Sequence, residues 1–348
     1  MERKHGGDCA AFEREYGFAP FDFSANVSPL GVPEGVREAI CRAAAGIDRY
    51  PDPDCRALRE GVAEKEGVSP AWVLCGGGAS DLIWRAALAA KPRRALVTAP
   101  CFAEYEAALG SCGCEVVRFP LAEPFAVPEE ILCKVDHNID FVVLCNPNNP
   151  TGRTIEPALL HRIVRRCRET GTRLLLDECF VDFLDEPEAH TMKGELGDCP
   201  RLLILGAFTK LYGMAGARLG YALCADAAFL DAMRRAAPPW SVSSLAQAAG
   251  LAALQEDNYV NQLRALITAQ RPRLTSALRA LGLCVIPGEA NFLLFRSETP
   301  LGGPLCERGI LLRGCGDFEG LDETWYRAAV RTREDNDRLV AAIGEVLA

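Results

Sequence analysis

The sequence predicts an α/β protein with a mostly parallel sheet in a large domain and a second, smaller domain after it. Short apolar runs alternate with longer amphipathic segments between about residues 72 and 224, which is the pattern of strands joined by crossover helices. After Pro238-Pro239 the pattern changes to long helical stretches followed by strand candidates. The chain of 348 residues is also longer than one ordinary domain of ~100–200 residues, which favours two domains.

The strands of the large domain are predicted from short apolar runs at residues 95–98, 115–119, 141–145, 173–176, 202–205 and 220–224. A crossover helix is predicted over 156–170, because Pro157 lies in its first turn and Gly171 comes just past its end. In the later part we expect helices over 243–254, 259–281 and 334–347, and strands over 292–295 and 326–330. The expected divisions are an N-terminal arm over 1–45, a large domain over 46–237 and a small domain over 238–348.

Composition and charge exclude several classes of protein. The chain is 49% hydrophobic and 24% charged, as globular proteins are, and its net charge of −9 comes without any long Lys/Arg run, which argues against nucleic acid as a partner. The first eight residues lack the apolar core of a secretory signal, and no window reaches the ~18 apolar residues of a membrane span. We therefore expect a cytoplasmic protein that does not contact membranes.

The sixteen cysteines are scattered along the chain, mostly in apolar stretches, so we interpret them as reduced and buried rather than as a disulfide framework. Cys112-Gly113-Cys114 comes nearest to a metal motif but lacks the paired spacing of a zinc site. We interpret it as a turn before a strand and expect no metal.

A glycine-rich turn offers a place for a phosphate group. The apolar run 72–75 leads into Gly76-Gly77-Gly78-Ala79-Ser80-Asp81 and then into an apolar helix. Glycines let the backbone approach a ligand, and the free N–H groups at a helix start favour an anion. A plain connection is an equal interpretation of this turn alone, since it matches neither the Walker pattern nor the dinucleotide fingerprint.

Two further polar motifs follow apolar strands. The strand over 141–145 ends in the rigid loop 146–152, and the strand over 173–176 ends in Asp177-Glu178. Ligands bind at the carboxyl ends of strands in an open α/β sheet. The three motifs are therefore expected to converge on one crevice.

The next strand leads into a segment, residues 206–220, that contains Lys210 among several glycines. Taken alone, Lys210 could equally be a solvated surface lysine. The order and spacing of the whole set resemble the aspartate-aminotransferase superfamily of enzymes that use pyridoxal 5′-phosphate (PLP), also called fold type I, from about residue 5 to the C-terminus. The resemblance implies a large domain with a mainly parallel seven-stranded sheet, a small α+β domain that includes the N-terminal arm, and a homodimer whose subunits share each active site.

The resemblance assigns roles to individual residues. Lys210 resembles the lysine that binds PLP as a Schiff base, and Asp177 resembles the partner of the ring nitrogen, which keeps the ring an effective electron sink. Asn149 resembles the donor to the ring's 3-oxygen, and Arg218 resembles the phosphate-binding arginine. The other cofactor residues implied by the resemblance are Gly78, Ala79, Ser80, Phe102, Phe180, Thr209 and, reaching the neighbouring subunit's cofactor, Tyr50.

Two branches of the superfamily share these motifs: the histidinol-phosphate aminotransferases and the L-threonine-O-3-phosphate decarboxylases of cobalamin synthesis. The arm, with His5-Gly6-Gly7 and a Phe-Ser-Ala-Asn segment that includes Asn26, is similar to the decarboxylases. Position 180 also fits that branch, because Phe180 stands where the aminotransferases usually have a tyrosine that donates to the 3-oxygen.

Anionic substrates need cations, and three arginines lie on the C-terminal strands. Arg327 resembles the family's carboxylate-binding arginine and Arg313 resembles a substrate-phosphate residue, since a guanidinium suits both anions. Arg331 could bind substrate or form a solvated salt bridge.

The segment before Lys210 departs from the family pattern. The family usually has Ser or Thr three residues before the lysine and often Arg one residue earlier, whereas this chain has Ala207 and Gly206. The phosphate site therefore lacks one hydroxyl, for which Thr209 could partly compensate.

The expected function is PLP-dependent decarboxylation of L-threonine O-3-phosphate to (R)-1-aminopropan-2-ol O-phosphate in cobalamin biosynthesis. The alternatives are a histidinol-phosphate aminotransferase, which requires an oxo-acid acceptor, and a serine-phosphate decarboxylase. A non-catalytic regulator on this fold would carry a separate DNA-binding domain, and the residues before 20 offer no such segment.

Overall fold

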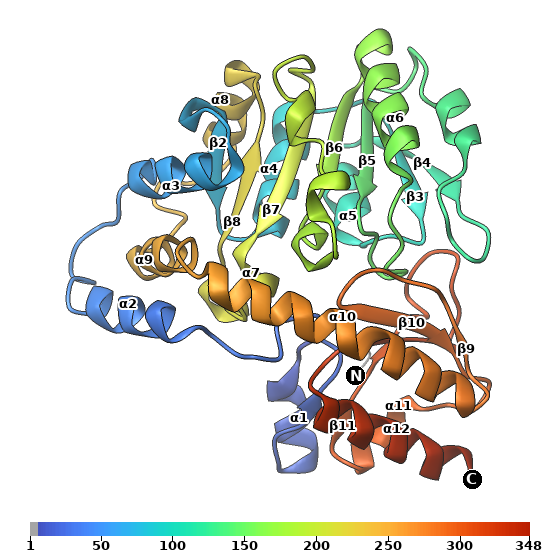
Figure 1. The fold of residues 1–348 in the computed structure, drawn as a ribbon. Helices are drawn as coiled ribbons and strands as arrows, with labels where there is room; N and C mark the ends of the chain where they lie inside the picture. The colour runs from blue at the N-terminus through green and yellow to red at the C-terminus, as the bar shows by residue number, and fades with distance from the viewer. Residues whose placement is uncertain (1–5) are drawn as a thin grey trace.

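The computed structural model describes residues 6–348 and contains a seven-stranded sheet with helices on both faces, beside a four-stranded sheet (Figure 1). In spatial order the large sheet consists of β2 (Val73–Gly76), β8 (Gly220–Leu223), β7 (Leu202–Ala207), β6 (Arg173–Asp177), β5 (Phe141–Cys145), β3 (Arg94–Ala99) and β4 (Glu115–Pro120). In this sheet, β8 is antiparallel to both of its neighbours and the other strands run parallel to one another. The predicted fold class and all six predicted strands of this region are confirmed.

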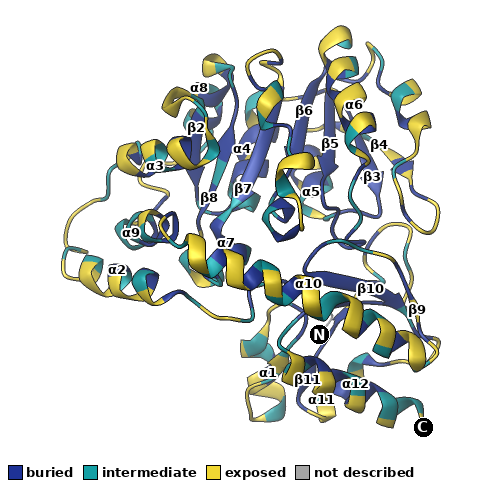
Figure 2. Cartoon of the chain, viewed as in Figure 1, coloured by how far each residue is buried: buried dark blue, intermediate teal, exposed yellow. Residues whose placement is uncertain are grey.

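The central strands are apolar throughout because both of their faces are covered. Successive side chains point to opposite faces, so Leu174 and Leu176 join one hydrophobic cluster and Leu175 joins another. One cluster includes residues of α3 (Arg56–Glu66) and α6 (Pro157–Thr170), and the other includes residues of α4 (Ala79–Ala90), α5 (Glu104–Ser111) and α8 (Ala227–Arg235). Figure 2 shows this sheet as a buried layer between helices that expose their outer faces.

The predicted punctuation of the crossover helix is confirmed. Pro157 occupies the first turn of α6, and Gly171 ends the helix in the left-handed conformation with φ 72°. The Cys112-Gly113-Cys114 segment is likewise a turn, between α5 and β4, with Gly113 at φ 75°. Local signals of this kind depend on backbone conformation alone, which is why the sequence shows them.

The smaller sheet is antiparallel in the order β12 (Arg313–Gly314), β13 (Trp325–Ala329), β10 (Phe292–Arg296) and β9 (Cys284–Val285). The helices α10 (Asp257–Ala280), α11 (Gly302–Glu307) and α12 (Arg333–Leu347) lie near it (Figure 1). From the N-terminal segment, which also forms α1 (Cys9–Tyr16), strand β1 (Phe21–Asp22) pairs in parallel with β11 (Ile310–Leu311). The N-terminal segment therefore joins the C-terminal part of the chain at this side of the molecule.

Three helices connect the two sides. Helix α2 (Glu34–Ala44) packs against α9 (Ser244–Ala253), which lies beside α3 of the large sheet, and α10 runs from there toward β9 and β10 (Figure 1). The remaining short elements are α7 (Phe208–Leu211) and the 3₁₀ turns η1 (Pro70–Trp72), η2 (Glu129–Lys134), η3 (Val181–Phe183), η4 (Pro187–Ala189), η5 (Lys193–Glu195) and η6 (Ala215–Ala217).

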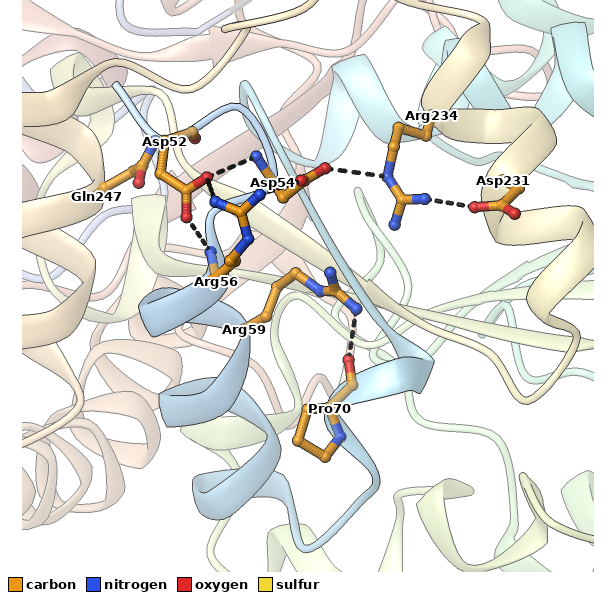
Figure 3. A network of polar contacts seen from close by, with 8 residues as sticks. All are labelled: Asp52, Asp54, Arg56, Arg59, Pro70, Asp231, Arg234 and Gln247. Atoms are coloured by element: carbon orange, nitrogen blue, oxygen red, sulfur yellow. Dashed lines mark hydrogen bonds and ion pairs between the residues drawn. The ribbon is translucent and has the colours of Figure 1, made fainter. Parts of the chain in front are cut away.

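A polar network fixes the loop before α3 (Figure 3). Asp52 accepts hydrogen bonds from the Arg56 N–H at 2.7 Å and from its guanidinium at 2.8 Å, and the Asp52 carbonyl accepts from Gln247 at 2.9 Å. Asp54 pairs with Arg56 at 2.9 Å and approaches Arg234 at 4.0 Å. The adjoining Tyr50 is 81% exposed and stacks on Trp240 at 4.6 Å between ring centroids. The loop thus holds an aromatic pair at the surface.

The sixteen cysteines are all free thiols, and nine of them are buried. Within residues 6–348, no helix has both the length and the apolar character needed to cross a bilayer. No cluster of three or more potential metal ligands occurs in this same range.

Candidate active site

A cavity of about 270 Å³ opens where the carboxyl ends of the large-sheet strands face the smaller sheet and the N-terminal segment. Its lining brings together most of the residues that the sequence singled out. On the large-sheet side these are Ala79, Ser80, Phe102, Asn149, Asp177, Phe180, Thr209, Lys210 and Arg218, and on the opposite side they are Asn26, Arg313 and Arg327.

Asp177 is the last residue of β6 and its carboxylate is buried. Oδ2 accepts a hydrogen bond from the Tyr105 hydroxyl at 2.6 Å, and Oδ1 accepts one from the Cys179 N–H at 3.0 Å. Burial and the neighbouring Asp177 raise the pKa of Tyr105 well above its usual value, so this phenol remains a donor. These two donors fix the orientation of the Asp177 carboxyl group at the cavity wall.

Lys210 lies in α7, directly after β7, and its side chain lines the same cavity. Burial is the main reason that the pKa of Lys210 falls from 10.5 to about 8, and the positive charges of Arg327 and Arg218 lower it further. A substantial fraction of this amine is therefore neutral near pH 8. A neutral amine in a cavity is a nucleophile.

The start of α4 is arranged for an anion. Gly78 precedes the helix with φ 100°, and no side chain caps the N–H groups of the first turn. The next two residues, Ala79 and Ser80, line the cavity. A Cβ at Gly78 would lie 2.8 Å from a nitrogen of the Arg218 guanidinium, so the glycine lets this arginine approach. Helix N–H groups and a guanidinium thus face one end of the cavity.

Asn149 and Arg327 join the two sides of the cavity. The buried Arg327 guanidinium donates to Asn149 Oδ1 and, at 2.8 Å, to the carbonyl of Ser24 in the N-terminal segment. Among the described residues, Arg327 Nε and Asn26 Oδ1 are buried without a hydrogen-bond partner. Unsatisfied buried polar atoms that face a cavity indicate a polar ligand. Burial, with a contribution from Arg313, lowers the pKa of Arg327 to about 10, so it is still a cation at neutral pH.

Arg313, on β12, is paired directly opposite Arg327 in the small sheet. It forms an ion pair with Asp317 at 2.7 Å and lies 5.0 Å from the centroid of the Phe318 ring. Two buried arginines therefore lie on one wall of the cavity. Such a wall suits a ligand with two anionic groups.

Aromatic rings complete the cavity. Phe102 lies edge-on to Tyr105 at 5.7 Å between ring centroids, and Phe180 lies edge-on to Phe292 at 5.0 Å. Both Phe102 and Phe180 line the cavity, and neither offers a hydrogen bond.

Some predicted residues lie elsewhere. Arg331 is outside the cavity lining, where it pairs with Asp335 at 3.1 Å and donates to the Asp22 carbonyl at 3.2 Å. Tyr50 lies at the surface beside Trp240, and Gly78 lies behind the lining. His5 falls outside the described residues.

Sequence reasoning missed three groups of the site. The Tyr105 hydroxyl donates a hydrogen bond to Asp177. Cys145 and Cys179 line the cavity, and the Ser24 carbonyl accepts a hydrogen bond from Arg327. The available signal for Tyr105 was its position three residues after Phe102 at the start of a helix. Backbone groups such as the Ser24 carbonyl leave no signal in residue identity.

The structure gives a reason for Gly206. A Cβ at this position would lie 2.2 Å from the Tyr221 ring, whose hydroxyl donates to Glu66 at 2.6 Å. Tyr221 thus fills the space next to Gly206. Ala207 lines the cavity without a hydroxyl, and Thr209 lines it nearby.

Comparison with known proteins identifies the family. Residues 20–343 match the family model described as aminotransferase class I and II. The chain belongs to the class I and II aminotransferase family. It is 38% identical to the threonine-phosphate decarboxylase of Salmonella typhimurium, covering 99% of this chain and 96% of that protein, and 34% identical to a histidinol-phosphate aminotransferase of Desulfitobacterium hafniense, covering 93% and 91%.

Solved structures of aminotransferase-family proteins give the same result. The histidinol-phosphate aminotransferase of Clostridium acetobutylicum superposes with a TM-score of 0.87 at 27% identity, covering 93% of this chain and 98% of that one. For the L-threonine-O-3-phosphate decarboxylase of Porphyromonas gingivalis the TM-score is 0.83 at 26% identity, with coverage of 93% and 98%. The histidinol-phosphate aminotransferase of Sinorhizobium meliloti, solved with pyridoxal 5′-phosphate, gives 0.86 at 27% identity, with coverage of 98% and 94%.

Membership of the aminotransferase family makes this chain a PLP-dependent, aminotransferase-like enzyme whose cofactor is pyridoxal 5′-phosphate. The cavity fits that cofactor on chemical grounds. The amine of Lys210, whose pKa is lowered, suits the aldehyde of the cofactor, and the buried carboxyl group of Asp177 suits its ring nitrogen. The uncapped start of α4 and Arg218 suit its phosphate.

Proposed function

We propose that this enzyme decarboxylates L-threonine O-3-phosphate, giving (R)-1-aminopropan-2-ol O-phosphate and carbon dioxide for cobalamin biosynthesis. The observation that carries the proposal is the pair of buried arginines, Arg313 and Arg327, on one wall of the cavity opposite Lys210. The substrate carries one carboxylate and one phosphate, and each guanidinium can bind one of these anions through paired hydrogen bonds. The 38% identity to the Salmonella typhimurium threonine-phosphate decarboxylase supports the same substrate.

In the proposed arrangement the large-sheet side holds the cofactor. Lys210 would bind it covalently, Asp177 would pair with its ring nitrogen, and Asn149 would donate to its 3-oxygen. The groups that would hold its phosphate are Ser80, Thr209, Arg218 and the helix start at Gly78 and Ala79, and Phe102 would pack against its ring. The cofactor supplies an electron sink when bound, and these residues set its position and charge.

The opposite wall determines which bond breaks. The cofactor would supply the electron sink, and the residues that orient the substrate would select which of its bonds is cleaved. Arg327 binds the carboxylate and Arg313 the phosphate in our proposal, with Asn26 and His5 as further substrate contacts. When both anions are fixed, the bond to the carboxylate is the one held for cleavage. Arg331 acts through its contacts with Asp335 and the Asp22 carbonyl.

Phe180 supports decarboxylation rather than transamination. This ring packs edge-on against Phe292 and has no hydroxyl to offer the 3-oxygen. Asn149 is then the main side-chain donor at that oxygen. The proton affinity of the covalent linkage at Lys210 consequently differs from that in an enzyme with tyrosine at this position.

Transamination of histidinol phosphate is the second candidate, favoured by relatives such as the Desulfitobacterium hafniense enzyme at 34% identity. Carbon dioxide release from L-threonine O-3-phosphate without added oxo acid separates the two. We expect stoichiometric release with that substrate and slower release with L-serine O-phosphate. Rapid transamination of histidinol phosphate with 2-oxoglutarate, and no carbon dioxide from threonine phosphate, would establish the second candidate instead. A preference for L-serine O-phosphate would change the proposed substrate, while the proposed reaction would remain a decarboxylation.

We further propose a homodimer in the cytoplasm. The exposed pair of Tyr50 and Trp240 is suited to a second copy of the chain, where Tyr50 would reach the neighbouring cofactor phosphate. Sixteen free cysteines suit a reducing compartment. Sedimentation of the wild type and of Tyr50→Ala tests the assembly, and a wild-type monomer would contradict it.

A further inference from the structure

We propose that Tyr105 is a positioning residue that holds the Asp177 carboxylate in place, and thereby controls the affinity of the enzyme for the cofactor's ring nitrogen. The direct observation is the hydrogen bond from the Tyr105 hydroxyl to Asp177 Oδ2 at 2.6 Å. Tyr105 lies at the start of α5 and is fully buried. The inference rests on the proposed role of Asp177.

Tyr105 supplies the hydroxyl donor to Asp177. In the described part of the chain, Asp177 forms no salt bridge, and Cys179 contacts it through the backbone N–H, at 3.0 Å on Oδ1, and through the thiol. The thiol of Cys145, close by, donates instead to the Pro147 carbonyl at 3.1 Å. A thiol is a weak donor, so the phenol O–H and the backbone N–H are the stronger donors that hold this carboxylate.

The loss of one donor has a predictable direction. A buried carboxylate keeps one orientation only while donors hold its oxygens. Without the Tyr105 hydroxyl, Oδ2 loses its donor and Asp177 turns more freely about its side-chain bonds. A misdirected Asp177 binds a protonated ring nitrogen less well.

The same ring has a second contact that must be kept apart from the first. Tyr105 lies edge-on to Phe102, which lines the cavity. Tyr105→Phe retains the ring and this contact and removes the hydroxyl alone. The matched control is Tyr221→Phe, because Tyr221 also donates to a carboxyl group, that of the half-buried Glu66, at 2.6 Å but does not line the cavity.

Two probes separate the ring nitrogen from the rest of the cofactor: pyridoxal 5′-phosphate and 1-deazapyridoxal 5′-phosphate, in which a C–H replaces that nitrogen. Each is titrated into apoprotein, and the ratio of the two dissociation constants is read from visible absorbance. We expect Tyr105→Phe to reduce the preference for pyridoxal 5′-phosphate by about ten- to a hundredfold, the range for a hydrogen bond to a charged group. The affinity for the deaza compound should be nearly unchanged, and Tyr221→Phe should keep the wild-type ratio.

Equal weakening of both probes by Tyr105→Phe, or an unchanged ratio, would overturn the inference. Asp177→Asn distinguishes that failure from failure of the proposed role of Asp177. If Asp177→Asn abolishes the preference while Tyr105→Phe retains it, the inference alone fails. If Asp177→Asn retains the preference, the assignment of Asp177 itself fails. In the double variant, removal of the Tyr105 hydroxyl should have no further effect on the ratio.

Discussion

The two walls of the cavity are built in different ways. On the large-sheet side, Asp177 ends β6 and Lys210 follows β7, so each functional group is placed by the strand that precedes it. On the other side, Arg327 is held by contacts with Asn149, more than 170 residues away, and with the Ser24 carbonyl in the N-terminal segment. The first wall is positioned by local structure and the second by long-range contacts. Substitutions on the two walls should therefore have different consequences.

Lys210→Ala should produce the largest effect, because it removes the amine that the large-sheet wall presents to the cavity. The proposed decarboxylase activity should fall by a factor of about a thousand or more, since no covalent attachment of the cofactor remains. Borohydride reduction of the wild type followed by peptide mapping checks the assignment. A pyridoxyl label on any lysine other than Lys210 would show that the assignment is wrong.

Comparison of Arg313→Lys with Arg327→Lys tests the second wall. Each loses paired hydrogen bonds to an anion, which should raise KM for L-threonine O-3-phosphate about ten- to a hundredfold. Arg327→Lys should in addition alter the visible spectrum of the bound cofactor, because Arg327 holds Asn149. Arg313 contacts Asp317 instead, so the cofactor spectrum of Arg313→Lys should match that of the wild type. Identical spectra for both variants would contradict a link between the walls.

The pH dependence of cofactor attachment tests the electrostatic part of that link. The pKa of Lys210 is lowered to about 8, so below that value the neutral fraction of the amine grows about tenfold for each unit by which the pH rises. The rate of covalent attachment to apoprotein should rise accordingly from pH 6 and level off above about pH 8. Arg327→Gln removes a positive charge that lowers this pKa, and the midpoint should move upward. A rate that still rises at pH 10 would mean an ordinary lysine.

Phe180→Tyr should have the smallest effect. A hydroxyl at this position adds a donor to the 3-oxygen and favours the deprotonated form of the covalent linkage. The pH midpoint of the bound cofactor's visible absorption should decrease by about one unit, as one such hydrogen bond allows. Phe183→Tyr, on a buried ring that does not line the cavity, is the control. An unchanged titration in Phe180→Tyr would mean that the ring is oriented differently.

The sequence predicts the position of a site residue correctly where the strand directly before that residue determines its place. Asp177 and Lys210 follow apolar runs, and their convergence was predictable because parallel strands end at one edge. The strands β9, β11 and β12 have two residues each and are too short for an alternating pattern to register. The Tyr105 hydroxyl, the Ser24 carbonyl and the engagement of Arg331 by Asp335 depend on tertiary contacts. No local pattern encodes such contacts.

The packing of Gly206 against Tyr221 restricts the order in which this sequence can change. An arginine, common at the Gly206 position in the family, cannot be accommodated while the Tyr221 ring lies 2.2 Å from the first side-chain atom. Tyr221 must become smaller first, and that step leaves Glu66 with Lys193 alone at 2.8 Å. Gly206→Arg is therefore unfavourable while Tyr221 is present. The effect of a side chain at position 206 depends on the residue at position 221, so the two positions are epistatic.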